Sequence, residues 1–175
     1  MDNSINLQPE IIKKLLKENG AFPNSGLFLL VYHRAFNLID QGSADFIEKT
    51  FAFNNWKNSW RAGIFDYAHY HSNTHEVLGV YKGEAKMQFG GDNGIEIAIK
   101  EGDVIIIPAG VAHKCIVASP FFKCVGAYPD GMEYDIKKGN SSERIQSEKN
   151  IEAVPLPDFD PVYNEGPLQL NWEIQ

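Results

Sequence analysis

The chain has 175 residues, of which 43% are hydrophobic, and this is enough for one domain with a sizeable core. Its formal net charge of −7 argues against nucleic acid as a partner, because binding to phosphates needs a basic face. The sequence has neither an apolar stretch approaching ~18 residues nor an apolar signal region at its start. We therefore expect a cytoplasmic protein that does not associate with membranes.

The first part of the chain, residues 1–57, is expected to form two short helices and an outer strand. Residues 9–19 place apolar pairs about one helical turn apart, with Lys and Glu opposite, which predicts an amphipathic helix ended by Gly20. Residues 27–32 are a run of apolar residues and predict a strand. A second helix is expected over residues 43–53, which place several bulky apolar side chains on one side.

A histidine-rich block follows in residues 63–83. Its beginning, residues 63–71, is rich in aromatic and β-branched residues and predicts extended chain. Because alternate residues of a strand share a face, His69 and His71 are expected to point the same way. A polar turn follows, and we expect a hairpin that folds Glu76 back towards the two histidines.

A second block supplies another histidine. Residues 104–107 form an apolar run short enough for a buried strand, and Pro108 and Gly110 interrupt the chain before His113 starts a further strand. Between the two blocks, residues 84–89 and 95–99 alternate with a two-residue period and predict a hairpin. Four of the five histidines of the chain lie in the two blocks, beside Glu76. Imidazole and carboxylate donors suit one divalent transition metal ion (Fe, Mn, Ni, Zn or Cu), and such a set leaves a position open for water or substrate.

The fourth protein ligand is ambiguous, because His75 is adjacent to Glu76 and is also within reach of the site. Either residue could complete the set formed by His69, His71 and His113. An inward histidine is ordinarily a core residue, but several imidazoles and a carboxylate buried together without a cation would be costly. The spacing therefore favours a metal site.

The two blocks resemble the paired motifs of the cupin superfamily. The first motif combines Gly, His-X-His, Glu and Gly, and the second combines Gly, Pro-X-Gly, His and a final Asn, which is Val117 here. The chain is also similar to the small bacterial YjlB-like single-domain cupins. The matching positions are Gly63, His69, His71, Glu76, Gly83, Gly102, Pro108, Gly110 and His113, and the narrower match adds residues 69–81, 125–130, 160–163 and 166–168.

The resemblance implies an all-β jelly-roll barrel, also called a double-stranded β-helix, and short strands with many turn signals agree with it. It implies that His69, His71, Glu76 and His113 hold the metal, and that His75 is a supporting residue or an alternative ligand. It further implies a small-molecule substrate or ligand and a homodimer. Among family reactions, a dioxygenase-like oxidoreductase fits the donor set; a metal-dependent sugar isomerase and a non-catalytic binding or sensing protein are the alternatives.

Other residues are candidates for the pocket or for packing. Trp60, Tyr67, Lys86 and Cys115 are possible pocket residues, although aromatic side chains in such positions commonly serve packing. Cys115 is expected to face Cys124 across a hairpin, with both as free, buried thiols. The whole chain is expected to be one domain, with residues 58–128 as the barrel core and residues 129–175 as an irregular tail. Four prolines argue against long regular structure in the tail: Pro155, Pro157, Pro161 and Pro167.

Overall fold

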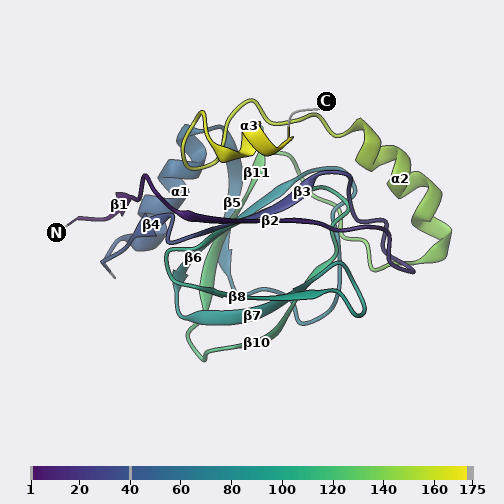
Figure 1. Ribbon diagram of the computed structural model, residues 1–175, viewed down its shortest axis with the longest axis horizontal. Coiled ribbons are helices and arrows are strands. Elements are labelled where there is room, and N and C mark those ends of the chain that lie inside the picture. Colours follow the sequence, from purple (N-terminus) through teal and green to yellow (C-terminus); the bar gives the residue numbers. More distant parts are fainter. Residues whose placement is uncertain (1, 40, 173–175) are drawn as a thin grey trace.

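The computed structural model describes residues 2–39 and 41–172, in which two antiparallel sheets face each other (Figure 1). The larger of these two sheets has six strands in the order β2-β3-β9-β6-β11-β5, and the smaller has three in the order β10-β7-β8. Strands β1 and β4 pair separately. This is the jelly-roll barrel that the sequence predicted. The strands are β1 (Ser4–Ile5), β2 (Glu10–Leu15), β3 (Phe28–His33), β4 (Phe36–Asn37), β5 (Trp56–Ala62), β6 (Glu76–Lys82), β7 (Glu84–Phe89), β8 (Ile95–Lys100), β9 (Val104–Ile107), β10 (His113–Ala118) and β11 (Lys123–Pro129), and the helices are α1 (Ser43–Phe53), η1 (Ser141–Glu143), α2 (Arg144–Ala153) and α3 (Pro167–Trp172).

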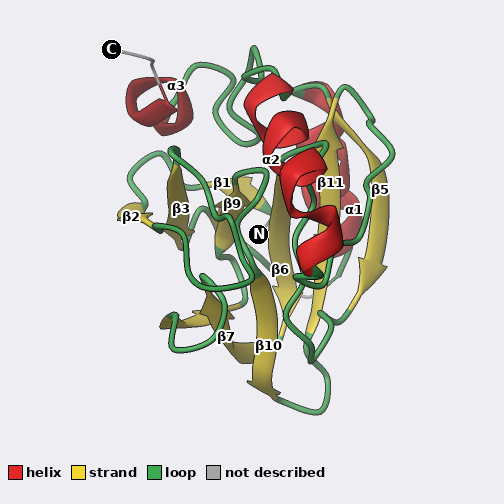
Figure 2. Cartoon of the chain, turned by 90° about the vertical axis from the view of Figure 1, so that its right-hand side faces the viewer, coloured by secondary structure: helices red, strands yellow, loops and turns green. Residues whose placement is uncertain are grey.

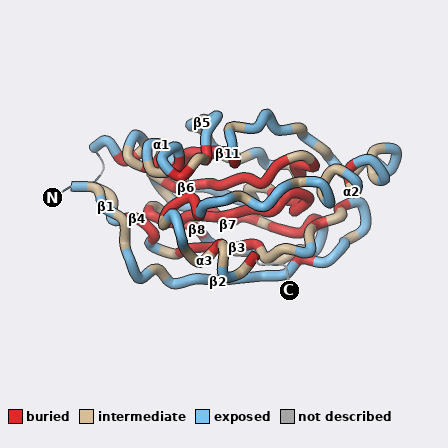
Figure 3. The backbone as a smooth tube through the Cα atoms, turned by 90° about the horizontal axis from the view of Figure 1, so that it is seen from above, coloured by how far each residue is buried: buried red, intermediate tan, exposed pale blue. Residues whose placement is uncertain are grey.

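The central strands of the larger sheet are buried on both faces. On β3, Leu29 and Val31 belong to the cluster between the two sheets, whereas Leu30 and Tyr32 belong to a second cluster on the outer face. The same alternation explains why all four residues of β9 are buried. In Figure 3, β6 is buried along most of its length, whereas the edge strand β2 is largely exposed.

Helices cover the outer face of the larger sheet. Helix α1 confirms the prediction for residues 43–53 and buries Ile47 and Phe51 against the strands. Gly79 on β6 allows this approach, because a Cβ atom there would lie 2.7 Å from Ile47 Cγ2. Trp172 of α3 donates a hydrogen bond from Nε1 to the carbonyl of Phe28, at 2.8 Å. Within the described residues, no helix has the length and apolar character needed to span a membrane.

The helix predicted for residues 9–19 is wrong, because this segment contains strand β2. All six residues of β2 pair with β3, from Glu10 opposite His33 to Leu15 opposite Phe28. The apolar pairs in the sequence fit a strand as well as a helix, since Ile12 packs between the sheets while Leu15 is 48% exposed on the other side. Pairing with the edge of a neighbouring strand therefore outweighs the local helical pattern.

The extended strand predicted for residues 63–71 is also wrong, as is the hairpin that would follow it. Strand β5 ends at Ala62, and the chain then runs as a loop in which His69 forms an isolated bridge with His113. Strand β6 pairs with β9 and β11 instead of with the histidine segment. The predicted hairpin of β7 and β8 and the predicted strands β3, β9 and β10 are confirmed.

The two cysteines do not face each other across a hairpin. Strand β10 pairs with β7 in the smaller sheet, where Cys115 lies opposite Met87. Strand β11 belongs to the larger sheet, where Cys124 lies opposite Ala62 and Val80. The turn between β10 and β11 therefore carries the chain from one sheet to the other, and both cysteines are free.

The buried thiols are expected to resist alkylation, because the thiolate is the reactive form. Burial raises the pKa of Cys124 strongly and, to a smaller extent, that of half-buried Cys115. We expect iodoacetamide at pH 8 to label Cys124 only after unfolding in urea and to label Cys115 slowly, as followed by peptide mass spectrometry. Rapid labelling of Cys124 in the native protein would contradict its position in the core.

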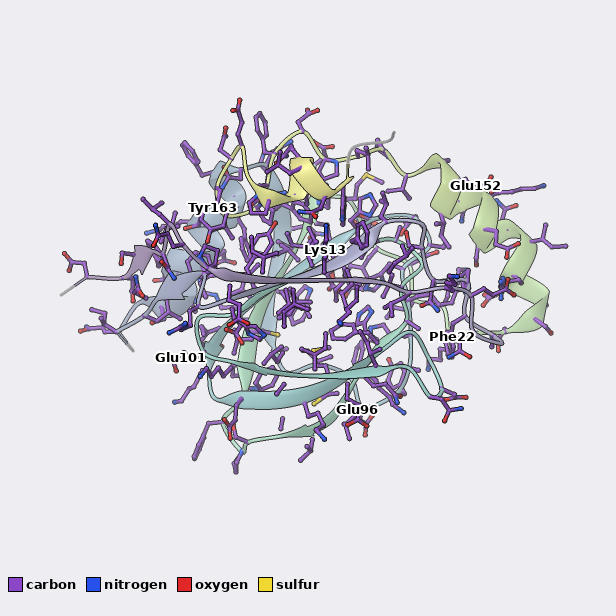
Figure 4. All side chains as sticks on the ribbon, in the orientation of Figure 1. Lys13, Phe22, Glu96, Glu101, Glu152 and Tyr163 are labelled. Atoms are coloured by element: carbon purple, nitrogen blue, oxygen red, sulfur yellow. The ribbon has the colours of Figure 1, made fainter. Side chains whose placement is uncertain are left out.

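The described part of the C-terminal segment, predicted to be irregular, contains η1, α2 and α3. Helix α2 lies across one end of the barrel, in front of the strands in the view of Figure 2. Its Ile151 packs against a small cluster that contains Phe22 and Tyr70. Figure 4 shows Phe22 at this end of the barrel, opposite the end that carries Glu101. The prolines that argued against regular structure lie between the helices or, as Pro167 does, at the first position of one.

Candidate metal centre

Three buried histidines come together inside the barrel. Ligand atoms of His69, His71 and His113 all lie within 4.8 Å of one another. Two backbone hydrogen bonds tie the loop to β10: His69 N donates to the His113 carbonyl at 3.2 Å, and His113 N donates to the His69 carbonyl at 2.9 Å. The loop histidine is thereby held on the strand that carries the third ring.

The hydrogen bonds of the three rings determine which nitrogen faces the cluster. Each ring has its Nδ1 atom at a backbone carbonyl, which can only accept, so each Nδ1 carries the proton. The Nε2 atoms are then lone-pair donors available to a metal ion, as is usual for metal-binding histidines. The carbonyl acceptors belong to Tyr67 for His69, Asp135 for His71 and Val111 for His113.

Glu76 directs one carboxylate oxygen at this cluster. Its Oε1 accepts a hydrogen bond from the Tyr128 hydroxyl at 2.9 Å. Among the described residues its Oε2 has no hydrogen-bond partner, although it lies 3.3 Å from His71 Nε2 and 3.2 Å from His113 Nε2. With the protons on Nδ1, three acceptor atoms converge without a proton between them, which is unfavourable unless a cation is present. The donor set therefore fits a divalent metal ion.

The charges of the cluster also favour the binding of a cation. Burial and the neighbouring His113 lower the pKa of His69 to about 3, so this ring is neutral at ordinary pH. Burial acts to lower the pKa of His71, but the Glu76 carboxylate outweighs it and leaves this pKa raised. Burial acts to raise the pKa of Glu76, but His71 and His113 hold it well below its usual range. The carboxylate is thus charged, and it attracts a cation to the Nε2 atoms.

The cluster opens onto a cavity of about 220 Å³. His69, His71 and Glu76 are part of its wall, so a ligand in the cavity can approach the donor atoms directly. The opposite walls are apolar and aromatic. They comprise Trp60, Ala62, Gly63, Ile64, Phe65, Leu78, Tyr128 and Tyr134.

The predicted pocket residues are placed differently from one another. Trp60 lines the cavity, whereas Tyr67 supplies the carbonyl for His69 and stacks its ring on Phe65. Cys115 packs against the cluster between the sheets. Lys86 lies on the outer side of β7, because its neighbours in the strand point inwards, and it forms an ion pair of 2.9 Å with Glu96. The structure does not bring Lys86 to the cavity.

His75 points away from the cluster. It directly precedes β6, so it faces the outer side of the sheet while Glu76 faces the inside. His75 Nδ1 accepts a hydrogen bond from Ala109 N at 2.9 Å, and the ring packs on Trp172 with centroids 4.7 Å apart. Between the two residues that the sequence left as alternatives, Glu76 is the one brought to the three histidines.

Three residues of the site were not predicted as site residues: Tyr128, Tyr134 and Asp135. Tyr128 lies in the segment 125–130 of the narrower family match, whereas Tyr134 and Asp135 lie outside the matching segments. Tyr134 stacks on Tyr128, with ring centroids 4.7 Å apart, and meets the edge of His71. Asp135 supplies the carbonyl for His71, and its carboxylate accepts hydrogen bonds from the backbone N and the hydroxyl of Ser72. The segment after β11 is therefore fastened over the site by groups that are distant in sequence.

Comparisons with known proteins agree with this architecture. A model of the cupin domain matches residues 62–122. The uncharacterized protein YjlB of Bacillus subtilis strain 168 is 46% identical over 146 residues, which are 83% of this chain and 86% of that protein.

Two solved structures show more distant similarity. Acireductone dioxygenase from Bacillus anthracis, with a cadmium ion in its active centre, has 18% identity and a TM-score of 0.39 over 55% of this chain and 68% of that one. Procruciferin, an 11S globulin from Brassica napus, has 24% identity and a TM-score of 0.38 over 46% of this chain. The matched region is only 21% of the length of that globulin.

Proposed function

The chain belongs to the cupin family, and on this premise we propose that it is a metal-dependent oxidoreductase of dioxygenase type acting on a small molecule. One observation carries the proposal: the converging nitrogen and carboxylate donors form part of the wall of a cavity. Such an arrangement leaves room for a substrate beside the ion, unlike a closed structural site.

Each residue of the centre has a distinct role in this proposal. The Nε2 atoms of His69, His71 and His113, with Glu76 Oε2, would hold the ion. A redox-active divalent ion in this donor set supplies Lewis acidity and electrons for oxygen chemistry. The Tyr128 hydroxyl orients Glu76, and burial beside that carboxylate raises the pKa of Tyr128, so the phenol keeps its proton and donates.

The sugar isomerase alternative has less support. The cations that could form a basic rim for a phosphorylated sugar are engaged elsewhere. Arg61 contacts Asp45 and Glu48, and the Lys82 ammonium lies 5.4 Å from the centre of the Phe121 ring. A non-catalytic binding protein shares the same cavity, and only a test of turnover separates it from an enzyme.

The test is oxygen uptake by protein loaded separately with Fe(II), Mn(II), Ni(II) or Cu(II), screened against small metal-chelating molecules. We expect uptake with one metal, in proportion to loss of the compound and above the rate of the free ion. Metal binding without uptake for any compound would favour the binding protein. Failure to bind any metal would remove the basis of the proposal.

Asp135→Ala is expected to weaken metal binding by about 10-fold, at the lower end of the usual effect of groups that orient metal ligands. The main-chain acceptor for His71 persists in this variant, but the carboxylate that anchors the segment to Ser72 is lost. Titration with Zn(II) under chelator competition measures the change. Glu133→Ala is the control, since Glu133 contacts Asn73 through its backbone carbonyl, which the substitution retains. An unchanged affinity in Asp135→Ala would mean that the anchor does not position His71.

A homodimer and a cytoplasmic location are also part of the proposal. Strand β2 is an edge of the larger sheet, with Ile11 and Leu15 40% and 48% exposed. An exposed edge of this kind can pair with another chain. The molar mass in solution, measured by light scattering, tests the dimer directly.

A further inference from the structure

The cavity beside the candidate metal centre is poor in charge. Among its lining residues, the described part of the chain places neither Lys nor Arg, and Glu76 is the only carboxylate. Nearby cations are held outside: Arg61 by Asp45 and Glu48, and Lys138 over the Tyr67 ring at 4.4 Å from its centre. A phosphate or carboxylate of the ligand that lies against these walls, away from the metal centre, would therefore lose its hydration without gaining a cationic partner.

The walls of the cavity are flat. Gly126 on β11 allows the Trp60 indole to lie directly against that strand, because a Cβ atom there would be 2.2 Å from Trp60 Cε2. The indole is held in place by a 2.8 Å hydrogen bond from Nε1 to the Tyr128 hydroxyl. Tyr134 stacks on Tyr128 with only 25° between the ring planes. Rigid aromatic faces of this kind favour a planar ligand.

The size of the cavity limits the ligand further. Its volume of about 220 Å³ lies below the ~300 Å³ at which pockets for drug-sized ligands begin. It exceeds the ~150 Å³ of an apolar cavity that accepts benzene. The space is therefore suited to one ring with a few substituents.

We propose that the site takes a small planar molecule with an uncharged, conjugated body, which presents two adjacent oxygen donors to the metal ion. This part rests on the proposed function. No Lys or Arg of the described chain lines the cavity, so a bound ion would be the cationic partner for a polar end of the ligand, and two oxygens on adjacent carbons can bind one ion together. Phosphorylated sugars and other molecules with a charged body are excluded. Trp60 and Tyr134 are the residues that determine this specificity.

The first experiment uses metal-free protein, so its outcome does not depend on the proposed metal chemistry. Isothermal titration calorimetry compares phenol with cyclohexanol; each has a six-membered carbon ring with one hydroxyl group, but only the phenol ring is planar. We expect phenol to bind ~3- to 10-fold more tightly, as an aromatic contact contributes beyond its buried area. Equal affinities, or no binding of phenol, would overturn the proposal that the aromatic walls select a planar ligand.

Two variants connect this preference to the named residues. Tyr134→Leu removes a ring that is 40% exposed, and Gly126→Ala displaces Trp60; both are expected to abolish the preference for phenol. Gly26→Ala is the matched control, because a Cβ atom at Gly26 would meet nothing within 4 Å, and it should behave as the unaltered protein. If Tyr134→Leu keeps the preference while folded, the assignment of specificity is wrong.

The second experiment uses protein loaded with Zn(II), which binds without oxygen turnover. Catechol offers two adjacent oxygens on a planar ring, and glucose 6-phosphate offers a phosphate on a non-planar body. We expect catechol to bind at least ~10-fold more tightly than phenol. Glucose 6-phosphate should bind more weakly than catechol, because its non-planar ring with several hydroxyl groups would lose hydration against the apolar walls even when its phosphate reaches the ion. Binding of glucose 6-phosphate at the level of catechol, or catechol no tighter than phenol, would overturn the ligand class. If the protein fails to take up Zn(II), the proposed function falls, whereas the phenol preference still stands or falls by the first experiment.

Discussion

Replacing His113 with alanine is expected to lower the affinity for a divalent metal ion by more than about 100-fold. Groups that only orient a ligand contribute about 10- to 100-fold, and loss of a ligand itself should exceed this. The variant removes one of the three clustered imidazoles and leaves Glu76 Oε2 with one neighbouring nitrogen fewer. Elemental analysis of protein purified without added metal and without a nickel column measures the result. His71→Ala should give the same loss.

The matched control for this experiment is His33→Ala. His33 lies at the end of β3, where its Nδ1 atom is 3.0 Å from Asp103, and it does not belong to the cluster. We expect this variant to retain the metal content of the unaltered protein. Full metal content in both His113→Ala and His71→Ala would show that the cluster is not the metal site.

Asp160→Ala is expected to lower the free energy of unfolding by about 3 to 5 kcal/mol, because it leaves several buried donors without an acceptor. The fully buried carboxylate accepts from the Tyr32 hydroxyl at 2.7 Å. It also accepts from the backbone N atoms of Val162, Tyr163 and Leu168, at 2.8, 3.1 and 3.1 Å. One side chain thus ties the C-terminal segment to strand β3. Equilibrium unfolding in urea, followed by fluorescence, measures the loss.

Two variants serve as references for this measurement. Asp158→Ala changes an exposed carboxylate in the same segment and should alter stability by no more than about 0.5 kcal/mol. Tyr32→Phe removes one of the donors to Asp160 and should cost about 1.5 to 3 kcal/mol. A loss below about 1 kcal/mol in Asp160→Ala would mean that the C-terminal segment is held mainly by apolar packing.

Much of the barrel and of the metal centre could be predicted from local patterns. The spacing of His69, His71, Glu76 and His113 predicted a set of candidate donors, and the structure brings these four side chains together. Strand β9 and the hairpin of β7 and β8 were also visible, because an apolar run and a two-residue alternation are properties of a single segment. Such features can be predicted because the spacing of residues within one segment determines which side chains point the same way.

Segments that could pair with more than one strand, or form a helix instead, were predicted wrongly. The apolar pairs around Ile12 fit a helix as well as the edge strand β2, and the free edge of β3 decided between them. Cys115 and Cys124 are close in sequence, yet their strands belong to different sheets. Pattern alone does not reveal which edge a strand will join, because pairing depends on the positions of all other strands.

The sequence by itself determined the family, the barrel and the candidate metal donors, since these follow from residue types at short, regular spacings. The alternation along β6 also separates His75 from Glu76, once the start of that strand is known. Only the tertiary structure brought Tyr128 to Glu76, Tyr134 to His71 and the Asp135 carbonyl to His71 Nδ1. These contacts join positions about 50 to 60 residues apart, and their geometry depends on how the two sheets close around the cavity. The candidate donors could therefore be recognised from short stretches of sequence, whereas their orientation and the shape of the cavity are properties of the whole fold.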